Sequence, residues 1–195
     1  MNKYELNAYI CEVVDLSFKR LNDIYKANKE RRTSTASRLI FPHLRNDMLR
    51  ISEQELRFVF VEVFNHYCDA KGLSLFYSIE TPTNDTYDFS GDPHRSDSGQ
   101  SAMFDLVIFD EGYNRRALIE FKANNRGAKS HKKDIVKLSN LKEGSEDVLR
   151  YFIEIIDNCV DGTIDSLRMK LSDTDSVIKI ENKIYSLRKG FNLNI

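Results

Sequence analysis

The segment 104–123 contains two apolar runs, 104–109 and 115–123, separated by the short turn sequence Asp-Glu-Gly-Tyr-Asn. Aliphatic and aromatic runs of this length, bounded by turn residues, are typical of buried β-strands. A connection this short keeps the two strands side by side and antiparallel. The segment therefore predicts a mostly apolar β-hairpin, and the rest of the fold has to be arranged around it.

The flanking segments predict helices on both sides of this hairpin. Hydrophobic residues recur every three or four positions along 3–28, which is the period of a helix with one buried face. Ser52 and Glu55 form a capping-box pattern, and the helix that they begin is expected to stop at Gly72. The complete prediction comprises helices 3–28, 52–70, 131–141 and 163–171, strands 73–80, 104–109, 115–123 and 149–156, and a terminal hairpin within 177–187 that turns at Glu181 and Asn182.

The order of these elements is that of an α/β protein with a mixed sheet. The segment 149–156 is apolar enough to be a helix instead of a strand. The segment 81–102 is rich in Pro, Gly, Ser, Thr, Asn and Asp, which predicts a long loop. We divide the chain into an N-terminal helix with a basic connecting segment, 1–50, and an α/β core, 51–195.

Composition excludes several classes of protein. Of the 195 residues, 41% are hydrophobic and 30% are charged, which is typical of a globular chain and unlike disordered or collagen-like sequences. No apolar run approaches the 20 or so residues that a membrane-spanning helix needs. Glu5 and Glu12 interrupt the N-terminal segment where a secretion signal would be apolar, so we expect a cytoplasmic protein with no membrane partner.

The cysteines do not indicate a metal site. Cys11, Cys68 and Cys159 are far apart in the sequence, lie among apolar residues and form no CxxC pair. Zinc sites require clustered Cys and His ligands. We expect three reduced cysteines that serve as small core residues.

Two segments are basic although the net charge of the chain is only −1. Residues 26–50 hold seven basic against two acidic side chains, and residues 122–137 hold six against one. Such segments are suited to phosphate contacts. The alternative is an ordinary solvated loop followed by a solvated helix face.

The expected hairpin register brings charged residues together. If Asp110 lies opposite Arg115, then Asp105 lies opposite Glu120, and Lys122 shares their face of the sheet. Facing carboxylates repel each other. Lys122 offsets this repulsion in part, and a divalent cation such as Mg²⁺ offsets it better. The alternative is a half-exposed hairpin whose carboxylates pair with Lys122 and Arg116.

The pattern Asp105, then Glu120-Phe121-Lys122, resembles the signature of the PD-(D/E)xK nuclease superfamily. Its context is also similar, because a helix carrying glutamates precedes the motif and a basic helix and a strand follow it. The resemblance covers 52–156 and implies a restriction-endonuclease-like αβββαβ core with an N-terminal helical extension. Phe104 stands where that family usually has Pro.

The resemblance also implies roles for individual residues. Asp105 and Glu120 would hold Mg²⁺, or Mn²⁺ in its place, and Lys122 would be the catalytic lysine. Glu55 would add a carboxylate from the preceding helix, with Glu62 as the alternative on the same helical face; Glu55 also has a purely structural role in the helix cap. Contacts to nucleic acid are expected from the basic segment and the following helix, namely from Arg126, Lys129, Lys132, Lys133 and Lys137.

Two functional hypotheses follow. The first is a metal-dependent nuclease that hydrolyses phosphodiester bonds, with double-stranded DNA as the expected substrate and a homodimer as one form of assembly. The second is a catalytically inactive nucleic-acid-binding or assembly subunit with the same fold. The complete Asp105, Glu120 and Lys122 set favours the first, because a binding module does not need all three.

Overall fold

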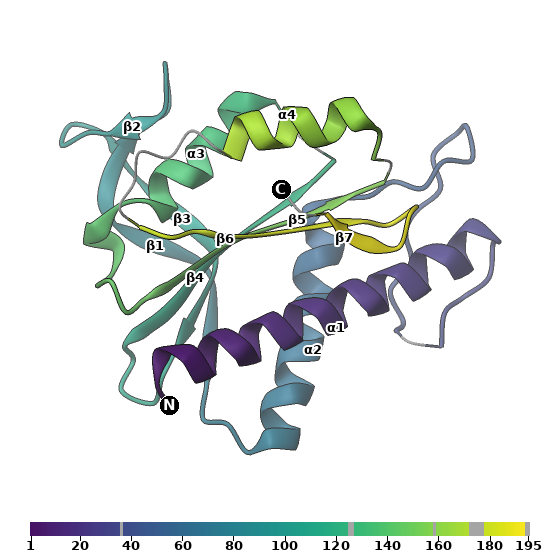
Figure 1. Cartoon of the computed structure of the whole chain (residues 1–195), viewed down its shortest axis with the longest axis horizontal. Coiled ribbons are helices and arrows are strands. Elements are labelled where there is room, and N and C mark those ends of the chain that lie inside the picture. The colour runs from purple at the N-terminus through teal and green to yellow at the C-terminus, as the bar shows by residue number, and fades with distance from the viewer. Residues whose placement is uncertain (36, 125–126, 158, 172–177, 194–195) are drawn as a thin grey trace.

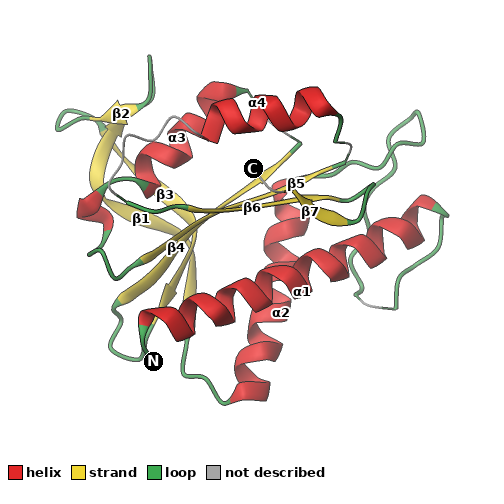
Figure 2. Cartoon of the chain, in the orientation of Figure 1, coloured by secondary structure: helices red, strands yellow, loops and turns green. Residues whose placement is uncertain are grey.

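A single mixed sheet with helices on both faces forms the molecule (Figures 1 and 2). The computed structural model describes residues 1–195 apart from 36, 125–126, 158, 172–177 and 194–195. Its elements are α1 (Lys3–Lys29), α2 (Glu53–Lys71), β1 (Phe76–Asp88), β2 (His94–Arg95), β3 (Gln100–Phe109), β4 (Arg115–Ala123), α3 (Ala128–Leu138), the short 3-10 helix η1 (Leu141–Glu143), β5 (Leu149–Ile156), α4 (Asp161–Leu171), β6 (Glu181–Ser186) and β7 (Phe191–Leu193).

The seven strands lie in the order β2-β1-β3-β4-β5-β6-β7. β1, β3 and β4 form an antiparallel meander, and α3 then carries the chain across to β5, which is parallel to β4. β6 is parallel to β5, and β7 returns antiparallel to β6. The predicted α/β class with a mixed sheet is confirmed.

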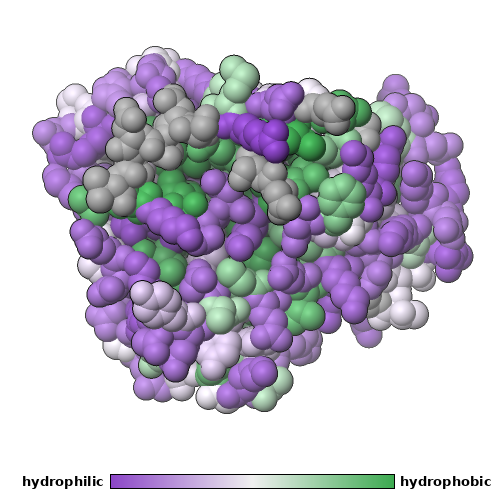
Figure 3. Space-filling model, in the orientation of Figure 1, coloured by the Kyte–Doolittle hydropathy of each residue, from purple (hydrophilic) through white to green (hydrophobic). Residues whose placement is uncertain are grey.

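The two faces of the sheet bury separate apolar cores. α1 and α2 pack on one face with Leu106, Ile119 and Phe121, whereas α3 and α4 pack on the other with Val107, Leu118 and Phe152. Side chains alternate along a strand, so β4 serves both cores through successive residues. Figure 3 shows that hydrophilic residues dominate one face of the molecule, with small hydrophobic patches among them.

The helix boundaries follow from local capping. Asn2 and Glu5 form a capping box at the start of α1, and Ser52 and Glu55 form the predicted one at the start of α2. α2 ends at Gly72, whose φ of 63° lies in the left-handed region that glycine adopts without strain. The apolar stripe of α1 is buried in its own core, so a homodimer would have to form through another surface.

The predicted hairpin register is confirmed in its middle, and Asp105 and Glu120 are not among the paired residues. Leu106 pairs with Ile119, Val107 with Leu118, and Ile108 with Ala117. The expected pair of Asp110 with Arg115 is wrong, because an irregularity after Ile108 places Phe109 opposite Arg115. Such a bulge adds one residue to one strand and increases the local twist next to the turn.

The predicted loop at 81–102 is largely strand, which corrects the sequence analysis. β1 continues to Asp88 and β3 begins at Gln100, with β2 between them. Thr81, Thr83, Asp85 and Tyr87 are buried at every second position, which is the period of a strand. The polar residues of this segment were typical of a loop, but in the structure the buried Glu143 carboxylate accepts hydrogen bonds from the Asp85 amide at 3.0 Å and the Tyr87 hydroxyl at 2.7 Å.

The C-terminal hairpin also differs from its prediction. Glu181 and Asn182 do not form a turn; they lie in β6, which pairs with β5. The reversal occurs after Ser186, where Gly190 has a φ of 75° and donates its amide to the Ser186 carbonyl at 2.7 Å. Residue 177, where the predicted hairpin began, lies outside the described residues.

The other boundaries agree with prediction to within a few residues, and 149–156 is a strand, β5. The three cysteines are free thiols; Cys68 and Cys159 are buried and Cys11 is partly buried. Among the described residues, no helix is both long enough and apolar enough to cross a bilayer.

The contribution of the α2 contact to stability can be tested with two phenylalanines of one helix. Phe60 is fully buried, and its ring meets the Phe121 ring edge-on with 5.4 Å between centroids, whereas Phe58 is 65% exposed. We expect Phe60→Ala to lower the free energy of unfolding by about 3–5 kcal/mol and Phe58→Ala to change it by less than about 0.5 kcal/mol. Urea denaturation measures both, and equal losses would contradict the placement of α2.

Candidate functional site

The two central strands separate at Asp105. The regular β3–β4 pairing ends at Leu106 and Ile119, and beyond it Asp105 Oδ2 accepts the Phe121 backbone amide at 2.8 Å. A side-chain carboxylate thus takes the place of a backbone acceptor between the strands. Asp105 Oδ1 is bound by the guanidinium of Arg57, which reaches down from α2 and also contacts Glu80 at 3.4 Å.

Glu120 turns toward the opposite helix layer. Its Oε1 lies 2.5 Å from the Lys137 ammonium of α3, and the residue is only 1% exposed. Lys137 also donates to the Met103 carbonyl at 2.8 Å. Burial raises the pKa of Glu120 well above its usual value, and the nearby carboxylates of Asp134 and Asp105 raise it further, against the opposing effect of Lys137.

Lys122 contacts α3 as well. Its ammonium lies 2.7 Å from Asp134 Oδ2, 3.8 Å from Glu53 Oε2, and 3.4 Å from the Phe121 carbonyl. Burial alone would lower the pKa of Lys122, but the negative charges of Asp134, Glu120 and Glu53 outweigh it and raise the pKa. Lys122 is therefore held as a cation, in a position set by Asp134.

These side chains form one ionic cluster, which we name the carboxylate–cation cluster. It consists of Asp105, Glu120 and Asp134 with Arg57, Lys122 and Lys137. Each carboxylate contacts a cation, so the charges of the cluster balance. Glu53 and Glu80 lie at its rim and are partly exposed to solvent.

The cluster lies where ligands commonly bind in α/β proteins. Glu120 and Lys122 are near the carboxyl end of β4, and the neighbouring parallel strand β5 places Glu154 opposite Lys122. Crevices at the carboxyl ends of parallel strands are frequent ligand sites. Glu154 is itself buried against His131 of α3, with 3.0 Å between Oε2 and Nε2.

Asp105, Glu120 and Lys122 were predicted to share one face of the hairpin, and the structure arranges them differently. Arg57 holds Asp105 from the α2 layer, whereas Lys137 holds Glu120 from the α3 layer. In the part of the chain that the structure describes, the ion-pair partners of Lys122 are Asp134 and Glu53, and none of the three predicted metal ligands is among them. The three motif residues still influence one another electrostatically, since Asp105 raises the pKa of Glu120 and Glu120 raises the pKa of Lys122.

The helix glutamates are placed differently from the prediction. Glu55 accepts the Ser52 amide at 2.9 Å and the Arg50 guanidinium at 3.0 Å, so it serves the helix cap. Glu62 pairs with Arg20 of α1 at 3.2 Å. Of the α2 glutamates, Glu53 is the one that reaches Lys122. The capping box explains the error, because it folds the Glu55 side chain back toward the chain segment before the helix.

The predicted nucleic-acid contacts divide into three groups. Lys129, Lys132 and Lys133 lie on the outer part of α3; Lys132 pairs with Asp92 at 2.6 Å, and the Lys133 ammonium lies 5.2 Å from the centre of the Phe89 ring. The prediction that Lys137 contacts nucleic acid is wrong, because Lys137 is buried against Glu120 and is not part of that surface. Arg126 lies outside the described residues.

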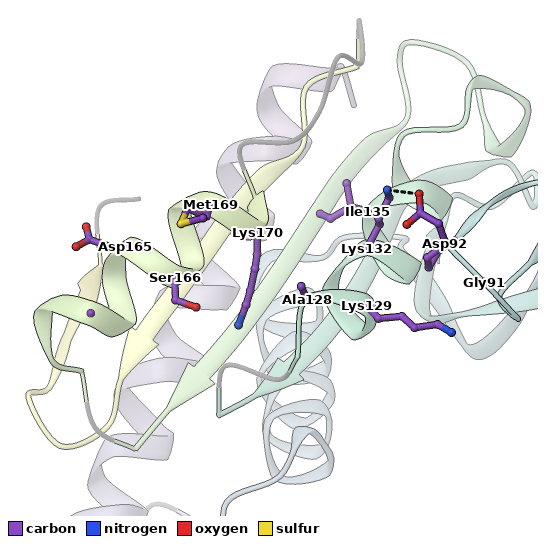
Figure 4. A pocket seen from close by; sticks show the side chains of 12 residues that line it. Gly91, Asp92, Ala128, Lys129, Lys132, Ile135, Asp165, Ser166, Met169 and Lys170 are labelled. Atoms are coloured by element: carbon purple, nitrogen blue, oxygen red, sulfur yellow. Dashed lines mark hydrogen bonds and ion pairs between the residues drawn. The ribbon is translucent and has the colours of Figure 1, made fainter.

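Lys129 and Lys132 also line a cavity of about 610 Å³ between α3, α4 and the β1–β2 connection (Figure 4). Ile135 and Met169 supply apolar lining, and the dashed line in Figure 4 marks the ion pair of Lys132 with Asp92. The cavity is separate from the carboxylate–cation cluster, since none of the six cluster residues lines it.

The carboxylates of the cluster suit a hard cation in their chemistry. Mg²⁺ is commonly held by one or two carboxylates together with waters and substrate phosphates. Asp105 and Glu120 can supply two carboxylates, although Arg57 and Lys137 already pair with them. Among the described residues, however, no group of three or more His, Cys, Asp or Glu side chains converges on one metal position.

The sequence analysis gave no role in the site to two members of the cluster, Arg57 and Asp134. Arg57 gave no signal, because an arginine on an apolar helix is an ordinary surface residue until the helix is placed. Asp134 was visible as the one acidic residue of the basic segment 122–137. An isolated acid among lysines, three residues before Lys137, is the pattern that could have indicated an ion pair.

Comparisons with protein-family models, with curated proteins and with solved structures found no match to this chain.

The role of Lys137 as the counter-ion of Glu120 predicts a pH-dependent loss of stability. Removing one partner of a buried ion pair typically costs about 3–5 kcal/mol, so Lys137→Met should reduce the free energy of unfolding by that order at pH 8. The pKa of Glu120, already raised by burial, would rise further. A group with a raised pKa destabilises the fold as pH increases, so the loss at pH 5 should be smaller.

Urea denaturation at both pH values measures this difference. Lys133→Met, on the outer side of the same helix, is the matched control and should change stability little at either pH. A Lys137→Met loss that is the same at pH 5 and pH 8 would show that Glu120 does not depend on this ammonium.

Proposed function

We propose that this protein is a metal-dependent nuclease of the PD-(D/E)xK type that acts in the cytoplasm on phosphodiester bonds, above all in double-stranded DNA. The observation that carries the proposal is the carboxylate–cation cluster at the point where β3 and β4 separate, because this cluster contains Asp105, Glu120 and Lys122. A buried group of carboxylates and cations at strand ends is costly for stability, and such groups are concentrated at functional sites.

The order of the elements supports the proposal. α2, β1, β3, β4, α3 and β5 follow one another along the chain, with the short β2 inserted between β1 and β3. This is the αβββαβ order that the sequence resemblance implies, with Asp105 on the second long strand and Glu120 and Lys122 on the third. α1 is then the N-terminal addition, and β6 and β7 extend the sheet.

Each residue has a proposed role in the reaction. Asp105 and Glu120 would hold Mg²⁺ or Mn²⁺, and such an ion supplies an activated water and stabilises charge on a phosphate. Lys122 is held as an ammonium by Asp134, which suits it to stabilise negative charge that develops in the transition state. Glu53 replaces Glu55 and Glu62 as the α2 carboxylate nearest to this lysine.

Basic side chains at the surface would bind the DNA backbone. Lys129, Lys132 and Lys133 project from α3, and Arg38 and Arg45 are exposed in the segment between α1 and α2. Contacts of this kind bind phosphates without reading sequence. Binding should therefore weaken as salt concentration rises.

A second candidate has its own supporting observation. Arg57, Lys122 and Lys137 already neutralise the three carboxylates of the cluster without a metal. A protein that uses this fold only to bind nucleic acid or to assemble with other subunits would keep such an internally paired cluster for stability. Cleavage assays distinguish the two candidates.

The active-site test is Lys122→Ala in a cleavage assay on plasmid and short duplex DNA, with Mg²⁺ or Mn²⁺ and with EDTA as the blank. Loss of one well-placed electrostatic group should reduce the rate by about 10²–10³-fold. Duplex binding measured in Ca²⁺ should stay nearly unchanged, and a thermal melt verifies folding. Undiminished cleavage by purified Lys122→Ala would refute the site, and absence of metal-dependent cleavage by the wild type would favour the binding subunit.

The basic surface predicts the opposite behaviour. Charge reversal at Lys132 and Lys133 should weaken duplex binding and reduce the slope of affinity against salt, because fewer counterions are released. The chemical step at saturating DNA should be unaffected, since neither residue belongs to the cluster. Binding titrations at several salt concentrations, combined with single-turnover cleavage, separate the two effects; a slower chemical step with normal binding would contradict this assignment.

A further inference from the structure

The cavity between α3 and α4 is a groove that follows both helices (Figure 4). It is lined from α3 by Lys129, Lys132 and Ile135 and from α4 by Ser166, Met169 and Lys170. These residues recur at helical spacing, so each helix turns one face toward the groove. The volume of about 610 Å³ lies within the range that small-molecule sites usually have.

The groove begins where β4 and β5 end. Ala128 is the first residue of α3 and Gly162 is the second residue of α4, and both line the groove. α3 follows β4 along the chain and α4 follows β5, and these two strands are parallel neighbours. The carboxyl ends of parallel strands are where α/β proteins usually bind their ligands.

Apolar side chains from three segments line the groove. Pro93 is buried, Ile135 is only 6% exposed, and Met169 is 76% exposed. A methionine side chain is flexible, and its sulfur makes favourable contacts with aromatic rings. Ile135 on α3 and Met169 on α4 therefore suit a flat aromatic group bound between the two helices.

The groove is also basic. Three of its lining residues are lysines and two are aspartates. Asp92 is paired with Lys132 at 2.6 Å, and Asp165 is paired with Arg168 at 3.5 Å. Lys129 instead donates to a backbone carbonyl at 3.0 Å, and a neutral carbonyl does not balance its charge. A phosphate would balance it, because lysine binds phosphate as a point charge.

We propose that this groove binds a nucleotide, with the base between Ile135 and Met169 and the phosphate against Lys129. A nucleotide joins a flat aromatic ring to a phosphate, and the groove offers a partner to each. The proposal goes beyond the proposed function, because such binding needs neither a metal nor cleavage. The nucleotide has two sources, a free mononucleotide and the unpaired end of a DNA strand, which the experiment distinguishes.

Calorimetric titration of the full-length protein with dAMP, in buffer that contains EDTA, tests the proposal. We expect saturable binding with a Kd below about 1 mM. Deoxyadenosine and inorganic phosphate, titrated separately, should each bind at least about tenfold more weakly, because each lacks one of the two contacts. Decanoate, an apolar anion without a ring, should bind no better than phosphate.

Two results of these titrations would overturn the proposal. The first is the absence of saturable dAMP binding up to about 1 mM. The second is equal binding of dAMP and decanoate, since the groove would then accept any anion with an apolar part.

Variants locate the nucleotide in the groove. Met169→Glu places a carboxylate on the exposed wall and should weaken dAMP binding by at least about tenfold. Met48→Glu, at a 52% exposed methionine between α1 and α2, is its control and should bind dAMP like the wild type. Thermal melts verify that both variants are folded, and wild-type dAMP affinity in a folded Met169→Glu would overturn the proposal.

A lysine variant tests the phosphate contact alone. Lys129 is exposed, and Lys129→Met should weaken dAMP binding by about tenfold while leaving deoxyadenosine binding unchanged, because only the phosphate loses a partner. Lys71→Met, in the last turn of α2, is the control for loss of one positive charge. Equal weakening of dAMP and deoxyadenosine by Lys129→Met would contradict the placement of the phosphate.

DNA ligands identify the source of the nucleotide. If the groove binds strand ends, a single-stranded tail should increase the affinity for a short duplex, and Met169→Glu should lose that gain. A tail without effect, together with dAMP binding, assigns the groove to free mononucleotides. A wild type that cleaves DNA with Mg²⁺ but does not bind dAMP overturns this inference alone, and one that binds dAMP without cleaving DNA overturns the proposed function alone.

Discussion

The hydrogen bond from the Phe121 amide to the Asp105 carboxylate is the interaction on which the site depends. A regular hairpin would continue past Leu106 and Ile119 with backbone acceptors, and its polar side chains would stand above or below the sheet. Here a carboxylate enters the ladder, so the strands part. The parting lets Arg57 approach from α2 and leaves Glu120 and Lys122 to be held from α3. Asp105 thereby joins α2 to β4, and the adjacent β4 residues Glu120 and Lys122 contact α3.

The cost of this arrangement is electrostatic. Burial opposes ionisation of Glu120, and the adjacent Asp134 and Asp105 add repulsion, so its pKa is raised even with Lys137 in contact. Buried ion pairs contribute little to stability, because desolvation offsets most of the attraction. The chain contains another buried carboxylate, Glu143, but that one is satisfied by the Asp85 amide, the Tyr87 hydroxyl and Arg115 and ties η1 to β1. Glu143 is thus held by backbone and side-chain donors, whereas Glu120 is held by Lys137 beside two other carboxylates.

The candidate site shows which features residue patterns can predict and which they cannot. The two apolar runs predicted the hairpin that carries Asp105, Glu120 and Lys122, and its middle pairs agree with the predicted register, whereas the pairing assumed at the turn is wrong. The choice of Glu55 and Glu62 failed for a physical reason: helical spacing states which residues share a face but not which neighbour that face meets. Glu55 turns back to Ser52, Glu62 faces Arg20, and Glu53 reaches Lys122. Lys137 was expected at the surface because lysines usually are, whereas a buried acid draws it inward.

The sequence by itself determined what depends on neighbouring residues: the two capping boxes, the helices they begin, the central hairpin and the α/β class. These features arise from short-range periodicity and backbone geometry. Only the tertiary structure decided the rest. β1 continues through the polar segment beyond Thr81 because Glu143, 56 residues after Tyr87, satisfies its buried groups. Likewise, Arg57 is 48 residues from Asp105, and no local pattern carries information about a partner that distant. The packing of the elements decides which charges compensate each other in a buried site. Attraction between ions depends on their distance in space and not on their separation along the chain.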